Sequence, residues 1–591
     1  MLRTIYCGEL REEHIGQEVK VCGWVQRQRD LGGLIFIDLR DRSGIVQLAF
    51  DQDSDKEDFE KAFATRSEYV LCATGTVRSR GESARNANIP TGFIEIAVTH
   101  LDIISAAQTP PFEIVDNSNA REELRLKHRY LDLRRPELQS KLIARSKITT
   151  IARNFFADNG FIDVETPILV KSTPEGARDY LVPSRVHPGS FYALPQSPQL
   201  YKQLLMVSGF DRYFQIARCF RDEDLRADRQ PEFTQIDLEM SFVDQEDIID
   251  VNERFLKHLF KEFKGIDLEI PLQRMPYDQA MLRYGCDKPD LRFGFEIVEL
   301  TELLKDCEFK VFADTIANGG KVRAINVKGG GKFTRKEIDS LTDYVKTQQK
   351  AKGLAWTKNN GGEISSSYAK FLTEDENKAI YDAMGFENDD IIFIVADKTK
   401  VVCAALGALR CEVARRLNII DPDCYKLLWI TDFPMFEYDE EENRYVATHH
   451  PFTAPRDEDL EFLLTDPGKV YSKAYDIIIN GSEAGGGSVR IHTPEVQNKV
   501  FDAIGLTKEE SQLKFGYLLE AFKYGVPPHA GLAYGLDRLV GLLLGTDAIR
   551  DVIAFPKVQN ASELMTECPS EVPQKSLDEL FISVNPPAKE E

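Results

Sequence analysis

Two short segments, far apart in the sequence and each carrying one arginine, most constrain what this chain can fold into. The first is Phe220-Arg221-Asp222-Glu223, and the second, Gly531–Arg538, reads Gly-Leu-Ala-Tyr-Gly-Leu-Asp-Arg. Each segment places its arginine at the edge of an apolar, glycine-punctuated element. A planar guanidinium stays charged and binds two phosphate oxygens at once. Because no P-loop accompanies the two arginines, they predict an ATP site built on an antiparallel sheet.

The bulk composition indicates a soluble protein of several domains. With 591 residues the chain is too long for one hydrophobic core, so about three or four domains are expected. Hydrophobic residues make up 42% and charged residues 29%, as in ordinary globular proteins. Met1–Tyr6 has no apolar signal core, and nowhere do about 18 apolar residues run together. We therefore expect a cytoplasmic protein without a membrane span.

Cysteine spacing and net charge narrow the possible partners. The 10 cysteines form no C-x-x-C pair, which favours reduced thiols over a metal or redox site. The net charge of −22 argues against non-specific binding of nucleic acid, and we expect no DNA partner. A local basic face can still bind RNA, because physiological salt screens distant charges.

The sequence of residues 1–105 predicts an OB-type barrel, because about five short segments within residues 17–104 have the pattern of β-strands. Phe36 lies among four arginines in this region: Arg27, Arg29, Arg40 and Arg42. A cationic groove with an aromatic platform is typical of barrels that bind single-stranded nucleic acid. The residues alone equally allow Phe36 to be a core side chain.

The remaining chain predicts a hinge and a divided catalytic domain. Residues 106–140 form a basic hinge, and the catalytic domain occupies 141–288 and 421–560, with a helix at Lys141–Asn159. An inserted α+β domain at 289–420 contains expected strands at Lys310–Ala313 and Ile391–Ala396 and a helix at Thr334–Gln349. The stretch Lys328–Lys332 lacks the full phosphate-loop pattern and predicts a turn. Residues 561–591 form a C-terminal extension with a loose end.

Several segments resemble the class II aminoacyl-tRNA synthetases. Asn159–Pro167 resembles motif 1, Phe220–Glu223 with Phe233–Asp237 resembles motif 2, and Gly531–Arg538 resembles motif 3. Two further segments resemble substrate-side segments of the bacterial-type aspartyl-tRNA synthetases: Thr173–Tyr180 and Gln196–Gln199. The resemblance covers nearly the whole chain. It implies an α+β multidomain fold with an OB-type barrel, a class II antiparallel-sheet catalytic domain and an inserted α+β domain.

The chemistry implied by this resemblance needs no protein nucleophile. Aspartate attacks the α-phosphorus of ATP, giving aspartyl-adenylate and pyrophosphate, and the terminal adenosine of the tRNA then takes the aspartyl group. Such a site works by positioning and charge neutralisation. The implied catalytic residues are Arg221 on the α-phosphate and Arg538 on the γ-phosphate. The implied ATP-binding residues are Arg221, Asp222, Glu223, Gln230, Phe233, Glu483, Gly535, Leu536, Asp537 and Arg538.

Asp476 and Glu483 resemble the family's acidic pair for Mg²⁺, which prefers oxygen ligands. Lys202 and Arg490 resemble the two cations that take the substrate side-chain carboxylate. Asparagine would leave these partly buried cations unpaired, so rejection of about 10⁴-fold is expected. The implied residues for L-aspartate are Glu175, Ser197, Gln199, Lys202, Arg221, Asp237, His449 and Arg490.

In the barrel, the resemblance implies an anticodon site. Phe36 would stack on a base, while Gln47 and Glu95 offer hydrogen bonds to base edges, and Arg29 and Arg78 complete the site. The partner is tRNA(Asp), with tRNA(Asn) as the alternative in a relaxed enzyme. Leu31 favours strict tRNA choice, because relaxed bacterial relatives carry histidine there. Gly81 favours the relaxed alternative.

Two other rival functions remain. A lysine- or asparagine-specific relative conflicts with Lys202 and Arg490, because lysine would be repelled and asparagine would leave the cations unpaired. A non-catalytic single-strand binding protein leaves Arg221, Glu483 and Arg538 without a role.

Motif 1 implies a homodimer, with Pro167 near the contact.

Overall fold

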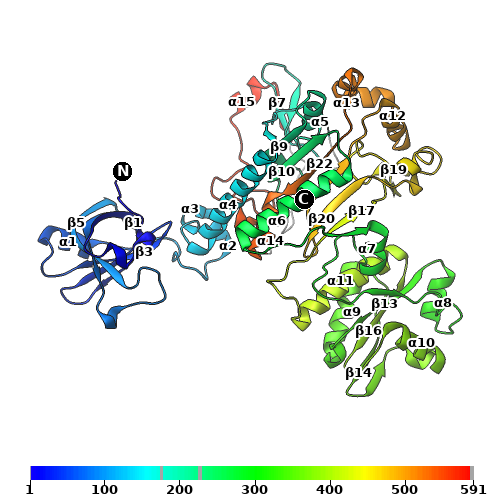
Figure 1. Cartoon of the computed structure of the whole chain (residues 1–591), viewed down its shortest axis with the longest axis horizontal. Helices are drawn as coiled ribbons and strands as arrows, with labels where there is room; N and C mark the ends of the chain where they lie inside the picture. Colours follow the sequence, from blue (N-terminus) through cyan, green and yellow to red (C-terminus); the bar gives the residue numbers. More distant parts are fainter. Residues whose placement is uncertain (1, 174–177, 224–228, 547, 586–591) are drawn as a thin grey trace. The chain divides into compact units, whose positions relative to one another are not determined.

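The computed structural model describes residues 2–173, 178–223, 229–546 and 548–585, and the chain forms two compact units. The first unit comprises the chain up to Ser146 with two returning segments, one ending at Gln230 and the other being Ala548–Pro573. The second unit contains the rest of the chain. Figure 1 shows their elements, and each unit is described by itself below.

The N-terminal part of the first unit is a closed barrel with strand order β1-β2-β3-β5-β4. Its strands are β1 (Glu18–Asp30), β2 (Ile35–Asp41), β3 (Gly44–Phe50), β4 (Val70–Ser79) and β5 (Ile94–Ser105). Alternating residues of these strands fill one apolar core, which confirms the predicted OB-type barrel. The sequence interpretation missed helix α1 (Lys56–Ala64), which is capped by the Asp55 side chain.

The predicted basic hinge contains helices α2 (Glu122–Lys127) and α3 (Arg129–Asp132), and α4 (Pro136–Asp158) begins within its last residues. Its arginines are engaged inside the protein. Asp132 is fully buried and accepts hydrogen bonds from Arg129 at 2.9 Å and Arg135 at 2.6 Å. Arg129 also donates to the carbonyl of Ile553 in the returning segment. Much of the positive charge counted in the sequence therefore stabilises this unit instead of facing solvent.

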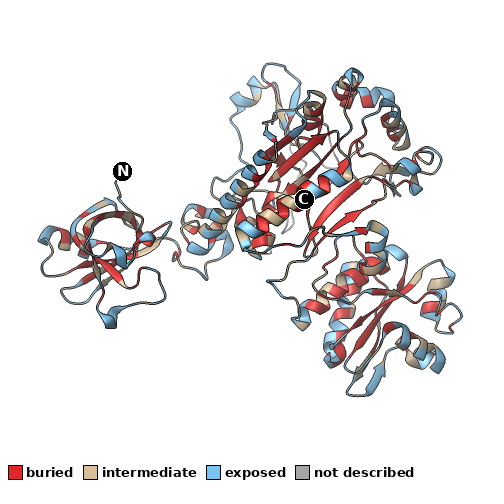
Figure 2. Cartoon of the chain, viewed as in Figure 1, coloured by how far each residue is buried: buried red, intermediate tan, exposed pale blue. Residues whose placement is uncertain are grey.

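The second unit is built on an eight-stranded sheet of order β11-β17-β20-β21-β22-β10-β9-β6. Only the outer pairs β6/β9 and β11/β17 are parallel. Figure 2 shows that the central strands are buried. The strands are β6 (Ile162–Asp163), β9 (Arg212–Phe220), β10 (Glu232–Ser241), β11 (Gln273–Pro276), β17 (Leu427–Thr431), β20 (Ala474–Ile479), β21 (Ser482–Val489) and β22 (His529–Gly535).

Helices cover this sheet. The longest is α6, whose apolar face is buried and whose ends carry an aspartate cap and a left-handed glycine, Asp244 and Gly265. The helices are α5 (Gln199–Val207), α6 (Gln245–Lys264), α7 (Tyr277–Tyr284), α12 (Pro494–Ala503), α13 (Lys508–Ala521), α14 (Leu536–Leu544) and α15 (Gln574–Glu579). Two small hairpins complete the unit: β7 (Leu181–Pro183) with β8 (Phe191–Ala193), and β18 (Phe436–Asp439) with β19 (Arg444–Ala447).

The inserted region forms a five-stranded antiparallel sheet of order β12-β13-β16-β14-β15. Its strands are β12 (Ile297–Glu299), β13 (Lys321–Val327), β14 (Ala355–Asn360), β15 (Glu363–Ser366) and β16 (Ile391–Asp397). Its helices are α8 (Lys310–Ala317), α9 (Arg335–Gln349), α10 (Glu374–Met384) and α11 (Thr399–Leu417). Figure 1 shows α9 and α11 together beside this sheet.

One element of the inserted region was predicted wrongly. Lys310–Ala313 begins helix α8 and is not a strand. Phe312 and Ile316, four residues apart, pack into the same apolar cluster, so helical spacing decides over the local β-branched composition. The predicted helix after Thr334 is confirmed, and Gly330–Lys332 forms the expected turn. No helix in the described part of the chain combines the length and apolarity that crossing a bilayer requires.

Candidate active site

The sheet order explains how two arginines so distant in sequence come to share one site. Strand β22 lies between β10 and β21, with Gln235 paired to Gly535 and Gly485 paired to Tyr534. Arg221 follows the end of β9, which is the other neighbour of β10, and Arg538 lies in the first turn of α14 after β22. The two arginines therefore follow β22 and β9, the strands on either side of β10 in one largely antiparallel sheet, as the sequence predicted.

Each arginine is held by a specific contact. The guanidinium of Arg221 lies over the Phe233 ring, 5.6 Å from its centroid, and Arg221 Nε lies 3.8 Å from Glu223 Oε1. Arg538 donates from its NH1 group to the backbone carbonyl of Glu483 at 2.8 Å. Phe233 therefore presents a flat aromatic surface beside Arg221, as an adenine-stacking residue would.

The other predicted ATP-binding residues have different local roles. Asp537 is buried and accepts a hydrogen bond from the Thr234 backbone N–H at 2.9 Å, which ties α14 to β10. Leu536 is buried, and Asp222 lies 3.5 Å from Arg178. Gln230 belongs to the first unit, where its amide exchanges hydrogen bonds with the Lys557 backbone.

Two carboxylates converge above one glycine. A Cβ atom added to Gly486 would lie 2.4 Å from Asp476 Oδ1 and 3.9 Å from Glu483 Oε1. Burial and then the nearby Glu483 and Asp287 carboxylates raise the pKa of Asp476, while Lys288 opposes the rise. A divalent cation stabilises carboxylate oxygens that lie close together and repel one another. The described residues contain no group of three or more metal-ligating side chains, so further ligands would come from phosphate or water.

A buried network of charges lies next to this site. Lys202 donates to Asp237 Oδ1 at 2.5 Å and lies 3.4 Å from Glu239 Oε2. Arg490 forms a two-pronged pair with Glu239, at 2.9 and 3.0 Å, and also donates to Ser488. Burial alone would raise the pKa of Glu239, but Arg490 and Lys202 outweigh it and hold that pKa below its usual value.

This network changes the physical reason expected for substrate choice. The two cations were expected to be partly buried and unpaired without aspartate, but each is 2% exposed and already paired with a carboxylate. A bound aspartate would share these cations with Asp237 and Glu239. If these residues bind the substrate, rejection of asparagine would depend on the added charge of the substrate and not on cations left without any partner.

Polar atoms with no hydrogen bond inside the described chain mark where a ligand would fit. They include Gln199 Nε2, Asp237 Oδ2 and His449 Nδ1, all deeply buried atoms of predicted substrate residues. Ser197 lies beside them and accepts from the Gln199 backbone N–H at 3.3 Å. A small molecule bearing both an ammonium and a carboxylate would satisfy such a set. Glu175, also predicted here, lies outside the described residues.

Two histidines are held neutral in this region. Burial first and Arg490 second lower the pKa of His449 to about 4, and the same causes lower that of His450. His450 Nε2 lies 2.7 Å from Arg490 NH1, so a neutral ring accepts that hydrogen bond. Neither histidine is expected to titrate during catalysis near neutral pH.

The lowered histidine pKa predicts an acid-sensitive stability. Between pH 6.5 and about 4 an unfolded His449 binds a proton that the folded one does not, so stability should fall as pH falls through that range. Urea unfolding at neutral pH and near pH 5 measures this loss. His449→Gln should lose less stability than the wild type over the same interval. An equally steep loss in both proteins would contradict the assignment.

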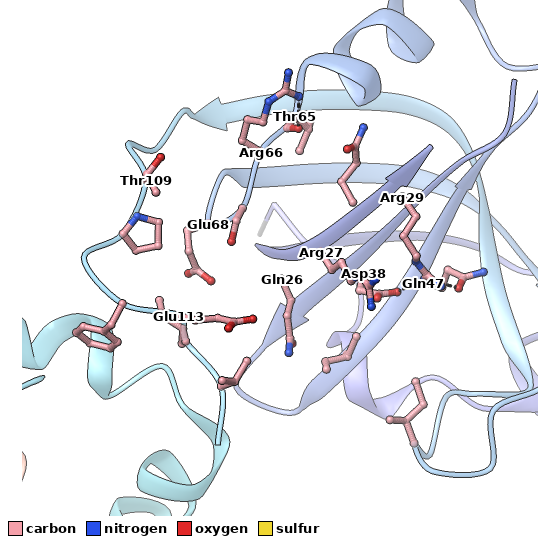
Figure 3. A pocket seen from close by; sticks show the side chains of 18 of the residues that line it. Gln26, Arg27, Arg29, Asp38, Gln47, Thr65, Arg66, Glu68, Thr109 and Glu113 are labelled. Atoms are coloured by element: carbon pink, nitrogen blue, oxygen red, sulfur yellow. Dashed lines mark hydrogen bonds and ion pairs between the residues drawn. The ribbon is translucent and has the colours of Figure 1, made fainter. Parts of the chain in front are cut away.

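A separate cavity of about 1040 Å³ is lined by residues of the barrel and by hinge residues between 109 and 115. Figure 3 shows Arg27, Asp38 and Gln47 on one wall, which the neighbouring strands β1, β2 and β3 supply. Arg29 donates to Asp38 at 2.8 Å and to Gln47 at 3.0 Å, and its guanidinium lies 5.8 Å from the centroid of the Phe36 ring. A polar, cationic cavity beside an aromatic ring is suited to nucleotide bases.

The predicted barrel residues largely form one network. Gln47 donates to Glu95 at 2.7 Å, and Arg78 donates to Glu95 at 2.8 Å. Phe36 is half-buried and does not belong to the barrel's apolar core, so it is not simply a core side chain. Leu31 and Gly81 are exposed, and no atom lies within 4 Å of a Cβ added to Gly81.

Two of the four arginines expected around Phe36 are used elsewhere. Arg40 is buried and donates to both oxygens of Glu68 at 2.9 Å. Arg42 lies over the Tyr6 ring. Arg29 pairs with Phe36 across β1 and β2, whereas Arg40 lies further along β2, opposite Trp24, a distinction the residue count ignored.

The sequence interpretation missed several residues of the active site. Glu239 follows Asp237 by two positions on β10, so both carboxylates share one face of the strand. That spacing on a buried strand was a usable signal, because buried carboxylates need cationic partners. Ser488 gave no comparable signal, since its position depends on the pairing of β20 with β21.

An antiparallel sheet that brings a motif 2 arginine and a motif 3 arginine together, with an OB barrel before it, defines a class II aminoacyl-tRNA synthetase. Residues 121–559 match the family model of class II tRNA synthetases (D, K and N). Residues 19–104 match the OB-fold nucleic acid binding domain. The chain belongs to the class II tRNA synthetases of this D, K and N group, which confirms the resemblance and implies that it uses ATP.

Similar proteins agree with this family. An aspartate–tRNA ligase of Ruminiclostridium cellulolyticum is 60% identical over 583 residues, covering 98% of both chains. An aspartate–tRNA(Asp/Asn) ligase of Caldanaerobacter subterraneus subsp. tengcongensis is 57% identical and covers 99% of this chain and 98% of its own. The crystal structure of Pyrococcus horikoshii asparaginyl-tRNA synthetase with asparaginyl-adenylate has a TM-score of 0.59 at 22% identity, covering 94% of this chain and 98% of that one. That last likeness concerns the fold.

Proposed function

We propose that this chain is an aspartate–tRNA ligase, which activates L-aspartate with ATP and transfers it to the 3′ end of tRNA(Asp). The observation that carries the proposal is the pair of buried cations, Lys202 and Arg490, together with unsatisfied buried atoms of other predicted substrate residues. Both cations pair with carboxylates of β10, the strand between those that lead to the two arginines. Asp237 Oδ2 is suited to accept the substrate ammonium. Arg221 and Arg538 would neutralise the phosphates of ATP as charge moves to pyrophosphate.

The direct test of activation is aspartate-dependent exchange of labelled pyrophosphate into ATP. The proposal predicts exchange with aspartate and only weak exchange with asparagine at the same concentration. The amino-acid preference is the informative comparison, because aspartate and asparagine are nearly equal in size and differ in charge. Faster exchange with asparagine than with aspartate would refute the assignment.

We also infer that Asp476 and Glu483 hold Mg²⁺, since Gly486 leaves the space in which their oxygens converge. The bound ion would supply charge neutralisation between the phosphates of ATP. Its carboxylate partners belong to the hairpin β20–β21, whose pairing sets their spacing.

Gly486→Ala tests this site. The added Cβ would lie 2.4 Å from Asp476 Oδ1 and displace that carboxylate. The Mg²⁺ concentration needed for half-maximal pyrophosphate exchange should rise about tenfold, while affinity for aspartate stays unchanged. Gly353→Ala is the matched control, because no atom lies within 4 Å of its Cβ position. An unchanged Mg²⁺ requirement in Gly486→Ala would argue against the site.

The barrel is proposed to bind the anticodon. Arg29 and Arg80 line the cavity, and their buried Nε and NH2 atoms, respectively, form no hydrogen bond within the described chain, so a bound base could supply the missing acceptors. Leu31 favours strict choice of tRNA(Asp), and a relaxed enzyme that also charges tRNA(Asn) is the alternative. Phe36 is placed to stack on a base.

Phe36→Ala should separate the two sites. Loss of one base–aromatic stack costs about 1–3 kcal/mol, so the KM for tRNA(Asp) should rise about 5- to 150-fold. Pyrophosphate exchange should not change, because activation needs no tRNA in this scheme. Steady-state charging and exchange assays on one preparation measure both quantities. A parallel loss of exchange would place Phe36 in a structural role.

A homodimer is proposed from the face that contains motif 1. Ile162, Ile168 and Leu169 are 49%, 46% and 52% exposed, and Pro167 lies with Ile168 and Leu169 along one cavity. Large apolar side chains gathered at one surface are typical of subunit contacts. The self-complementary contact of a two-fold dimer would cover them.

A further inference from the structure

The chain enters the inserted domain beside the hairpin that carries Asp476 and Glu483. Helix α7 ends at Gly285, and residues 286–294 lead from it into the insertion. Within this loop, Asp290 packs on the turn between β20 and β21, because a Cβ on Gly481 would lie 2.9 Å from Asp290 Cβ. Any movement of the loop would therefore press on the turn of the metal-binding hairpin.

The same loop brings two charges near the carboxylates. Lys288 Nζ lies 3.1 Å from Asp287 Oδ1. Both side chains interact electrostatically with Asp476, and Lys288 also interacts with Glu483. The position of the loop thus affects the metal-binding pair through contact and through charge.

Arg410, from helix α11 of the insertion, holds this loop. It is fully buried, and its NH2 group donates to the backbone carbonyls of Asp290 and Gly294, each at 3.0 Å. Its guanidinium lies between two rings, 4.8 Å from the centroid of Tyr284 and 4.7 Å from that of Phe293. The clamp therefore joins the insertion, α7 and the loop in one place.

Arg410 is costly as a purely structural residue. Its Nε and NH1 atoms are buried and have no hydrogen-bond partner in the described chain. Unsatisfied buried donors destabilise a fold, and an apolar side chain of similar volume would pack there without that cost. Arg410 instead holds the carbonyl groups of Asp290 and Gly294 in fixed positions.

Close backbone packing makes the connection rigid. A Cβ on Gly285 would lie 2.3 Å from the Cys403 carbonyl oxygen, and one on Gly407 would lie 2.9 Å from that of Tyr284. Helices α7 and α11 thus approach so closely that neither can slide without a clash. If α11 is displaced, residues 286–294 must therefore move with it.

We propose that the inserted domain positions the metal site: Arg410 clamps residues 286–294 against the Gly481 turn and thereby fixes the spacing of Asp476 and Glu483. This inference rests on the magnesium site of the proposed function. Arg410 contacts neither ATP nor aspartate in this scheme, so it is a positioning residue. The insertion then tunes affinity for the metal without contributing a ligand.

The test measures metal binding directly. Mn²⁺ is titrated into the full-length enzyme with a non-hydrolysable ATP analogue, and free Mn²⁺ is followed by electron paramagnetic resonance. Arg410→Met should weaken Mn²⁺ binding about tenfold, with Arg410→Lys in between. Arg415→Met, on the same helix but with a side chain 69% exposed, should bind as the wild type does. Aspartate affinity, measured by calorimetry, should be equal in all four proteins.

The possible failures can be told apart. A folded Arg410→Met protein with wild-type Mn²⁺ affinity would overturn the positioning role. Failure of the wild type to bind Mn²⁺ would instead remove the metal site of the proposed function. Equal weakening of Mn²⁺ and aspartate binding would show general damage to the fold and would also overturn the inference.

A second measurement needs no variant and covers the case in which Arg410→Met does not fold. Coupling between two sites is reciprocal, so occupation of the metal site must stabilise the clamp. Amide hydrogen exchange of the wild type should slow in 286–294 and 480–483 with Mn²⁺ and the analogue, compared with analogue and EDTA. Unchanged exchange in 286–294 would overturn the inference.

Discussion

Arg490→Met should abolish aspartate activation and destabilise the protein, whereas adding Glu239→Gln should restore stability without activity. Arg490 pairs with Glu239 through two hydrogen bonds in a buried region. Removing one partner of a buried pair leaves an uncompensated charge and costs about 3–5 kcal/mol. Removing both charges avoids most of that cost. Aspartate would still lack its cation, so kcat/KM for exchange should stay about 10³-fold lower in both variants.

Urea unfolding and pyrophosphate exchange on the same preparations measure the two effects. Arg444→Met is a suitable control, because that arginine is 50% exposed and lies outside the pocket. The decisive quantity is the difference in stability between the single and double variants. If the double variant were as unstable as the single one, Glu239 would not be the charge that Arg490 compensates.

Replacing either phosphate-facing arginine should nearly eliminate adenylate formation. Arg221→Ala and Arg538→Ala each remove a charge that we propose acts on the phosphates of ATP, and loss of one such electrostatic contact typically costs about 10²–10³-fold in kcat. The corresponding lysine variants keep the charge but lose the planar fork, so they should recover only part of the rate. The Arg538 variants should still bind aspartate, because Arg538 donates to the Glu483 backbone and is proposed to act on ATP.

Pre-steady-state adenylate formation and aspartate calorimetry separate these effects. The Arg538→Ala protein should bind aspartate with wild-type affinity while forming adenylate slowly. Loss of aspartate binding together with adenylate formation would show that Arg538 supports the fold of the pocket. Rapid adenylate formation by this variant would remove Arg538 from the chemistry.

The sequence predicted the parts of the fold that depend on local pattern. Strand alternation indicated the barrel, and the two arginine segments indicated an antiparallel sheet, both of which the structure confirms. The pattern failed at Lys310–Ala313, because a short apolar run allows helix and strand alike. Helix α1 was missed because it is short and its burial depends on the completed barrel.

The candidate site was predictable where a residue acts through its own chemistry. Arg221, Arg538, Lys202 and Arg490 carry charges whose use can be inferred from type and motif. Glu239 and Gly486 act through their neighbours, so their roles appear only once β10, β20, β21 and β22 are paired. The clamp at Arg410 depends on packing between the insertion and α7, which no local pattern encodes.

Charging of purified tRNA(Asp) and tRNA(Asn) with aspartate, side by side at equal enzyme concentration, tests the central claim most directly. The account predicts ATP-dependent attachment of aspartate to tRNA(Asp), with tRNA(Asn) charged far less because of Leu31. Comparable charging of both tRNAs would support the assignment as an aspartate–tRNA ligase, but it would show that the enzyme is the relaxed alternative and not the strict one. Charging of neither tRNA by enzyme supplied with ATP and Mg²⁺ would contradict the account.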